Sequence, residues 1–168
     1  MAGEYRHIAR EFGPVFDASS RILILGSFPS AKSREVNFYY GHLQNRFWPL
    51  MARLLEAPLP QTTEEKQALM LTHHIALWDS IDSCDIIGSS DSSIKNAVPV
   101  EIELVLNSAA IRQIYANGAA SAKVYSKFLF PRTGREIIPL PSTSPANAAW
   151  NMDRLFSEWQ QILPALAE

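Results

Sequence analysis

The chain has 168 residues, of which 47% are apolar, and its formal net charge at pH 7 is -2. This length and composition suit one domain, residues 1–168, with one core. The near-neutral charge excludes a global electrostatic attraction to nucleic acid or membranes, so an anion would need a local site. The single cysteine, Cys84, excludes an internal disulfide and a four-cysteine cluster.

Three features of the sequence bear on the expected location of the protein. No apolar run approaches the roughly 20 residues of a membrane span. Segment 1–10 is mixed and charged, unlike a signal peptide. A lone cysteine is compatible with a reducing compartment. We therefore expect a cytoplasmic protein, and a monomer.

Short apolar runs separated by helical patterns define the predicted elements. Residues 1–17 read as an irregular or short helical lead-in, and the apolar run 22–25 predicts a buried strand that Gly26 and Pro29 end. A polar and aromatic loop follows, longer than a strand-to-helix connection needs. The remaining pattern predicts strands over 75–78, 111–116 and 136–140, and helices over 45–55, 62–74, from 99 onward, 119–130 and 150–167.

Strands that alternate with helices predict a parallel sheet with right-handed crossovers. Four such strands with helices on both faces make a three-layer α/β/α sandwich. Parallel strands end at one edge of the sheet, where open α/β sheets hold their ligands. The loops after Leu25, Trp78 and Leu140 should therefore share one cleft.

The loop after the first strand carries residues with two readings each. Tyr39 and Tyr40 are either core or rim aromatics, or one of them is a stacking platform for a planar base. His42 is either a titrating group or a structural donor. Asn45 is by default a helix N-cap, although an amide on the rim of a cleft can hold a base edge or position a water.

The loop 142–147 and the remaining charged residues are similarly open. Ser and Asn before a helix are ordinary caps, yet hydroxyls and free N–H groups there also bind phosphate. The acids Asp79, Asp82 and Asp85 are either catalytic candidates or solvated loop residues. No spacing of His, Cys and carboxylates indicates a metal site, and the turn after Gly26 lacks the Gly-Lys-Ser/Thr ending of a P-loop.

Several short blocks give the chain a family resemblance over nearly its whole length. They are LGSFPS (25–30), FYYGH (38–42), NRFWP (45–49), ALWD (76–79), SSIKN (92–96) and LPSTSPAN (140–147). Together they resemble the uracil-DNA glycosylase superfamily. Within it, the chain is most similar to the hypoxanthine-DNA glycosylase branch, near the mismatch-specific uracil-DNA glycosylases.

The resemblance implies hydrolysis of the N-glycosidic bond of a damaged base flipped out of DNA, by water, with no metal or cofactor. Mismatch-specific relatives carry a water-orienting Asn in the first motif, where this chain has Phe28. The resemblance therefore points to Asn45 as the catalytic residue, with Asn37 a weaker match. Tyr40 corresponds to the aromatic that stacks on the flipped base. The expected substrate-binding residues are Gly26, Ser27, Phe28, Pro29, Tyr40, His42 and Asp79.

DNA contacts are expected from both loops. The second loop matches the motif that grips the backbone beside the lesion, where relatives often insert a bulky wedge, but Ala146 is small. A local positive patch on the rim should come from Lys32, Arg34, Arg46 and Lys95. The residues expected to contact DNA are Ser30, Lys32, Ser142, Thr143, Ser144, Pro145 and Asn147.

The resemblance to the hypoxanthine branch makes hypoxanthine the expected base, in double-stranded or single-stranded DNA. Its O6 and N7 acceptors suit an amide donor. One alternative is a mismatch-specific uracil or thymine glycosylase. Two alternatives belong to other classes. The protein could be a catalytically inactive base-binding module, given Phe28 at the Asn position, or an enzyme that processes free nucleosides.

Overall fold

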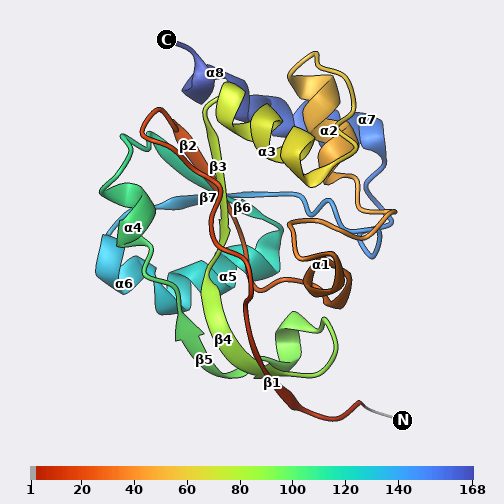
Figure 1. The fold of residues 1–168 in the computed structure, drawn as a ribbon, viewed down its shortest axis with the longest axis vertical. Coiled ribbons are helices and arrows are strands. Elements are labelled where there is room, and N and C mark those ends of the chain that lie inside the picture. Colours follow the sequence, from red (N-terminus) through yellow and green to blue (C-terminus); the bar gives the residue numbers. More distant parts are fainter. Residues whose placement is uncertain (1–2) are drawn as a thin grey trace.

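A computed structural model describes residues 3–168 of the chain. Its main sheet contains β2 (Ile22–Gly26), β3 (Ile75–Asp79), β6 (Gln113–Asn117) and β7 (Ile137–Leu140) in the order β3-β2-β6-β7, and all its pairs are parallel (Figure 1). Because β2 and β3 are covered on both faces, almost every residue in them is apolar and buried. The predicted four-stranded parallel sheet is confirmed.

Helices cover both faces of this sheet. α2 (Phe47–Leu54), α3 (Thr63–Thr72) and α7 (Met152–Trp159) lie on one side, and α5 (Ala119–Phe128) lies on the other (Figure 1). The predicted start of α3 is confirmed, because the Thr62 hydroxyl caps it by accepting a hydrogen bond from the Glu65 N–H at 3.0 Å. Because helices cover both faces of the sheet, the predicted three-layer arrangement is confirmed.

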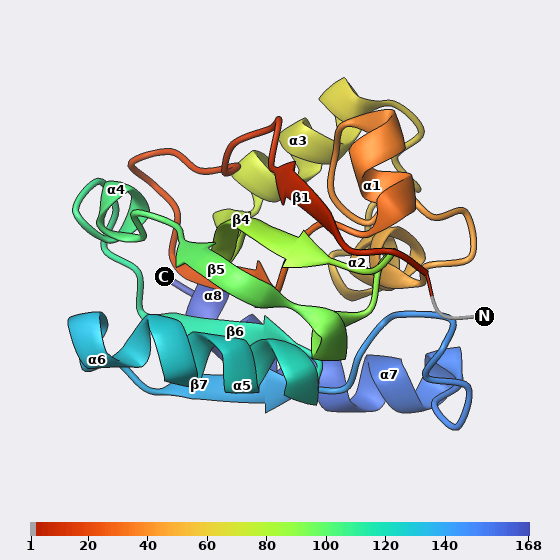
Figure 2. The ribbon, with the colours of Figure 1, turned by 90° about the horizontal axis from the view of Figure 1, so that it is seen from below.

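A second, antiparallel sheet was not predicted. It contains β1 (Arg6–Ala9), β4 (Ile81–Ile86) and β5 (Lys95–Pro99) in the order β1-β4-β5 (Figure 2). β4 follows β3 after only Ser80, and its inward residues pack in a small separate core with Phe28. The acids of this segment suggested an exit loop, but they alternate with buried apolar residues, which is the pattern of a half-buried strand.

Four smaller predictions need correction. The lead-in 1–17 contains β1, while Met1 and Ala2 lie outside the described residues. The first loop contains the short helix α1 (Ala31–Val36), and the segment before Val100 is β5, so the next helix is the short α4 (Glu103–Leu106). The helix predicted over 119–130 ends at Phe128 and is followed by α6 (Phe130–Thr133).

The closing helix is interrupted rather than continuous. It divides into α7, the short 3-10 helix η2 (Gln160–Ile162) and α8 (Leu163–Leu166). Pro164 explains the break, since proline supplies no backbone N–H and is tolerated only in the first turn of a helix. Among residues 3–168, no helix is both long enough and apolar enough to cross a membrane.

Candidate active site

The carboxyl ends of the parallel strands open onto one cavity of about 200 Å³. The predicted meeting of the loops after Leu25, Trp78 and Leu140 is confirmed, because residues from all three line its wall. The lining residues are Phe12, Gly26, Ser27, Phe28, Pro29, Ser30, Ser33, Tyr39, Tyr40, Asn45, Asp79, Ser89, Asp91, Asn117, Ser142, Thr143 and Ser144.

Asn45 lies on this wall with its amide held in one orientation. Its Oδ1 accepts hydrogen bonds from the Phe47 backbone N–H at 2.9 Å and from the Thr143 hydroxyl at 2.8 Å. Both donors require an oxygen, so the two ends of the amide cannot be exchanged. Within residues 3–168, no acceptor is hydrogen-bonded to the Asn45 Nδ2 group. The amide N–H₂ is therefore available to a ligand.

The structure gives Asn45 a role at the helix start that differs from the predicted N-cap, and its functional role stays a prediction. The helix begins at Phe47 with Arg46 as its cap residue, and Arg46 makes no side-chain capping bond. The Asn45 oxygen instead binds the first helical N–H. One end of the amide thus stabilises the helix start while the other end remains free at the cavity.

Thr143 and Asn117 support Asn45 from behind. The Thr143 hydroxyl is fully buried and accepts a hydrogen bond from the Asn117 Nδ2 at 3.0 Å. The Asn117 Oδ1 in turn accepts from the Thr143 backbone N–H at 3.0 Å. Since the hydroxyl accepts from Asn117, its own proton points to Asn45. This chain of bonds joins the ends of β6 and β7 to the amide.

Tyr40 forms another part of the wall. Its backbone has φ 53°, in the left-handed region, and its ring stacks on Phe47 with a centroid distance of 4.1 Å. The buried hydroxyl has no partner in hydrogen-bond geometry among the described residues, although the Asn117 side chain lies beside it. Burial, followed by the negative charge of Asp79, raises the pKa of Tyr40 well above its usual value. The phenol therefore remains a proton donor.

Ser27 adds a second unpartnered hydroxyl to the same wall. Its Oγ is buried and, within residues 3–168, has no group in hydrogen-bond geometry. Asp91 lies beside it on the short 3-10 helix η1 (Asp91–Ser93), and burial raises the pKa of the Asp91 carboxyl. Buried polar groups normally find partners, and exceptions are often functional. The cavity thus presents two hydroxyls and one amide N–H₂ to an occupant.

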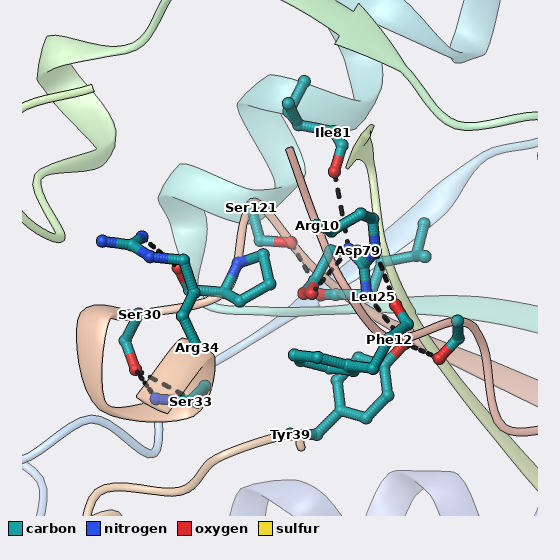
Figure 3. A network of polar contacts seen from close by, with 12 residues as sticks. Arg10, Phe12, Leu25, Ser30, Ser33, Arg34, Tyr39, Asp79, Ile81 and Ser121 are labelled. Atoms are coloured by element: carbon teal, nitrogen blue, oxygen red, sulfur yellow. Dashed lines mark hydrogen bonds and ion pairs between the residues drawn. The ribbon is translucent and has the colours of Figure 1, made fainter. Parts of the chain in front are cut away.

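Asp79 is held by an ion pair at the base of the cavity. Its Oδ2 lies 3.0 Å from the Arg10 Nη1, and both side chains are at most 6% exposed (Figure 3). Burial raises the pKa of Asp79, and Arg10 opposes that shift. Arg10 also donates to the Tyr39 hydroxyl at 3.0 Å, and that hydroxyl donates to the Gly13 carbonyl at 2.8 Å. Asp79 is therefore a fixed anion in a network that organises the wall.

Gly26 is required by the approach of Asp79. The backbone N–H of Gly26 hydrogen-bonds to the Asp79 carboxylate. A Cβ at position 26 would collide with the Asp79 Oδ1. The first residue after the apolar run must therefore lack a side chain, because the neighbouring strand brings a carboxylate to the same point.

Arg46 connects the two loops that border the cavity. Its guanidinium donates to backbone carbonyls of the second loop, including Ser144 at 2.7 Å, Asn147 at 3.2 Å and Trp150. Its backbone N–H also donates to the Thr143 carbonyl at 3.0 Å. Arg46 therefore fixes the loops against each other, and its charge is used inside the protein rather than on the rim.

The second loop was predicted to open the last helix, but in the structure it ends before that helix begins. α7 begins at Met152 with Asn151 as its N-cap, so residues 142–147 form turns before it. Within the loop, the Ser144 N–H donates to the Ser142 hydroxyl oxygen and the Ala146 N–H donates to the Ser144 hydroxyl oxygen. The anion site predicted at a helix N-terminus is therefore not formed by this loop.

The other predicted site residues divide by position. Ser30 lines the cavity and also caps α1, whereas His42, Lys32, Pro145 and Asn147 do not line it. His42 is exposed and supports a turn. Two residues of the predicted positive patch also bind inside the protein: Arg34 donates to the carbonyls of Pro29 and Gly88, and Arg46 donates to the second loop. The patch itself stays a prediction. Lys32 is paired with Glu35 at 3.3 Å and Lys95 lies over the Tyr5 ring.

Sequence reasoning missed several wall residues. Asn117 could have been found, because it directly follows the strand predicted over 111–116 and belongs at the same edge as the other exit loops. The wall residue Asp91 and the Asp79 partner Arg10 gave no local signal, since the contacts that place them are made between distant segments. Among the described residues, no group of three or more His, Cys, Asp and Glu could hold a metal ion. The expectation of a cofactor-free reaction stays a prediction.

A cavity lined by amides and hydroxyls at the strand ends of a small parallel sheet suits an enzyme that binds a nucleobase. The family model described as the uracil DNA glycosylase superfamily matches residues 14–166, so the chain belongs to this superfamily of DNA glycosylases. The resemblance found in the sequence is therefore confirmed.

Individual relatives agree with this assignment. The chain is 34% identical over 160 residues to a hypoxanthine DNA glycosylase from Methanosarcina acetivorans, covering 92% of this chain and 98% of the relative. It is 31% identical over 138 residues to a hypoxanthine DNA glycosylase from Methanosarcina barkeri, covering 81% and 86%. It also matches the solution NMR structure of a Methanosarcina acetivorans protein described as a uracil DNA glycosylase. The TM-score is 0.76 at 31% identity, over 94% of this chain and 98% of that one.

Proposed function

We propose that this protein is a monofunctional DNA glycosylase that hydrolyses the N-glycosidic bond of hypoxanthine in DNA, as a cytoplasmic monomer in base excision repair. The observation that carries the proposal is the group of donors on one wall that have no partner among residues 3–168: the Asn45 N–H₂ and the hydroxyls of Ser27 and Tyr40. The names of the two similar archaeal proteins support the choice of base.

The donors match the charge that develops during the reaction. Breaking the bond leaves an oxocarbenium-like sugar and an electron-rich base. Hypoxanthine carries O6 and N7 acceptors on one edge, and the Asn45 N–H₂ is positioned to donate to such an edge. A preorganised donor of this kind stabilises the departing base more in the transition state than in the ground state. Asn45 is therefore our candidate catalytic residue.

Phe28 separates this proposal from the mismatch-specific uracil alternative. Its ring is 7% exposed and packs in the core of the second sheet, with the Arg34 guanidinium 5.8 Å from its centroid. An apolar ring in this position cannot orient a water through an amide. The uracil mechanism of the mismatch-specific relatives therefore lacks its key residue, and the polar function falls to Asn45 from the following segment.

The proposal is tested by incubating the protein with oligonucleotides that contain deoxyinosine, deoxyuridine or deoxyxanthosine, followed by alkali cleavage of abasic sites. We expect excision of hypoxanthine, with weaker or no excision of uracil. Faster release of uracil opposite guanine would favour the mismatch-specific alternative. Binding without cleavage would indicate an inactive base-binding module, and cleavage of free deoxyinosine alone would indicate a nucleoside enzyme.

A further inference from the structure

Leu43 is the most exposed large apolar side chain of residues 3–168. It is 94% exposed, whereas the other exposed large apolar residues lie between 41% and 51%. A leucine that is almost wholly in water gains nothing from burial in the folded chain. Single exposed apolar residues are common on protein surfaces, but this one is two residues from Asn45 in the candidate active site.

Leu43 occupies the tip of a turn that His42 holds closed. The His42 carbonyl accepts a hydrogen bond from the Asn45 N–H at 2.9 Å, which defines a turn over residues 42–45. The His42 ring adds a second bond, since its Nδ1 accepts from the Gln44 N–H at 3.0 Å. These two bonds fix the backbone on both sides of Leu43 and project its side chain outward.

The turn is fixed to the cavity as well as within itself. Asn45 ends the turn and is bonded through its side chain to Thr143, and Arg46 is bonded to the carbonyls of the second loop. The Cα atoms of positions 43 and 45 are at most about 7 Å apart, as chain geometry requires. Figure 1 shows this loop and the loop between β7 and α7 extending together from the same end of the fold. Leu43 therefore lies close to the cavity wall at Asn45, without lining the cavity itself.

Among the described residues, the facing loop exposes only small or polar side chains, at Pro145, Ala146, Ala148, Ala149 and Asn151. Its one large apolar side chain, Trp150, packs against the core. The large apolar side chain that is free to project from this side of residues 3–168 is therefore on the first loop.

We propose that Leu43 enters the base stack of duplex DNA and fills the space left by the damaged nucleotide when that nucleotide turns into the cavity. This inference rests on the proposed function. Apolar side chains that enter a base step compensate for unstacking, which a flipped nucleotide requires. The rigid turn suits the task, because the inserted side chain and the Asn45 donor then keep a constant separation.

The test compares duplex with single-stranded substrate, because only the duplex needs a side chain to replace a stacked base. Single-turnover excision of hypoxanthine is measured for the wild type, Leu43→Ala and Leu43→Met, each on a single strand and on a duplex with cytosine opposite. Leu59→Ala is the matched control, since Leu59 is also exposed, at 47%, and lies outside the cavity wall. Thermal melting of all variants checks that they fold.

We expect Leu43→Ala to lower the ratio of duplex to single-strand rates by at least about tenfold, the effect of one lost compensation for unstacking. Leu43→Met, which keeps an apolar side chain of similar reach, should restore most of the ratio, and Leu59→Ala should leave it unchanged. An unchanged ratio for Leu43→Ala, or equal slowing on both substrates, would overturn the proposal.

A binding measurement makes the result independent of turnover. The fluorescence of a 2-aminopurine placed beside deoxyinosine in the duplex should increase when the slow-cleaving Asn45→Asp protein binds. The increase should be smaller for a protein that carries both Asn45→Asp and Leu43→Ala. Equal brightening would reject insertion by Leu43. If the wild type excises hypoxanthine from no substrate, the proposed function fails, whereas wild-type excision with a normal Leu43→Ala ratio rejects only the insertion.

Discussion

The Thr143 hydroxyl donates a hydrogen bond to the Asn45 Oδ1 at 2.8 Å, across 98 residues of sequence. Together with the bond from the Phe47 N–H, it decides which end of the Asn45 amide faces the cavity. A side chain with one end anchored by two donors loses little freedom when the other end binds a ligand. The first two predictions, one for Asn45 and one for Thr143, follow from this relationship.

Asn45→Asp should fold normally and cleave very slowly. The aspartate oxygen can still accept from Phe47 and Thr143, so melting should be close to that of the wild type. The free end changes from a donor to a negatively charged acceptor, which repels the electron-rich departing base. Loss of one such donor typically costs on the order of a hundredfold or more in rate. Single-turnover excision of hypoxanthine and a melting curve measure the two effects.

Asn45→Ala serves as the companion variant. It removes the donor without adding charge, and it also leaves the Thr143 hydroxyl and the Phe47 N–H without their acceptor. We expect slow cleavage together with a loss of about 1 kcal/mol of stability, the usual cost of losing a cap. If Asn45→Asp cleaved at nearly the wild-type rate, Asn45 would leave the site and Asn37 would be tested next.

Thr143→Val should reduce both stability and turnover, because valine keeps the shape of threonine but removes the hydroxyl. The partly buried Asn117 N–H₂ loses its acceptor and the Asn45 oxygen loses a donor. A buried group left unpaired costs roughly 1–3 kcal/mol. Urea unfolding measures that cost, and excision kinetics measure the loss of amide orientation.

Thr143→Ser is the control for this prediction. Serine retains the hydroxyl and should restore the excision rate even if the lost methyl group lowers the melting temperature. A fully active Thr143→Val protein would mean that the Phe47 N–H alone is sufficient to orient Asn45.

The main sheet was predictable from sequence for a clear reason. Runs such as Ile22–Leu25 are apolar throughout, and only a strand covered on both faces has that pattern over so short a length. The common cleft followed from topology alone. β4 was missed because its acidic residues on the outward face resembled a loop, and its pairing with β5 shifts register twice, which weakens the alternation.

The site was predictable only in part. The residues directly after a strand, such as Gly26 and Asp79, could be located because a sequence pattern identifies where strands end. The partners that orient them could not. Arg10 contacts Asp79 across 69 residues, and nothing in the segment around Arg10 distinguishes it from a surface arginine. Long-range polar pairs depend on the completed fold, which local patterns do not describe.

Arg10→Met should destabilise the protein strongly. The substitution removes the cation from a pair that is almost fully buried and leaves the Asp79 carboxylate buried without a counter-charge. Breaking such a pair from one side typically costs about 3–5 kcal/mol. Urea unfolding at neutral pH measures the loss. Arg10→Lys keeps the charge but not the bonds to Tyr39 and Phe12, and we expect an intermediate stability.

The loss of stability in Arg10→Met, relative to the wild type, should depend on pH in one direction. Burial already raises the pKa of Asp79, and Arg10 opposes that shift. Without Arg10 the folded-state pKa of Asp79 should rise further above its unfolded value. The folded variant then takes up a proton more readily than the unfolded chain. Its deficit in unfolding free energy, relative to the wild type, should therefore shrink as pH falls through that raised pKa. A deficit that grew on acidification would show that the Asp79 charge is not the cause.

Tyr40→Phe separates a stacking role from a hydrogen-bonding role. The sequence predicted that the ring is the important part, in which case phenylalanine would be nearly neutral. The structure changes the expectation, because the hydroxyl is buried at the cavity and has no partner in hydrogen-bond geometry among residues 3–168. Removing an unpaired buried hydroxyl should leave the melting temperature unchanged or slightly higher. Removing a donor that the substrate uses should nevertheless slow excision.

Tyr40→Ala provides the comparison that interprets this result. It removes the ring as well, including its stacking on Phe47, and should weaken recognition of the damaged strand by roughly 1–3 kcal/mol, the range for one stacked base. Binding to deoxyinosine DNA and single-turnover excision are measured for both variants. Slow excision by Tyr40→Phe in a protein of undiminished stability would assign the hydroxyl to the substrate. Wild-type excision by Tyr40→Phe, with a defect only in Tyr40→Ala, would instead limit Tyr40 to the contact that its ring makes.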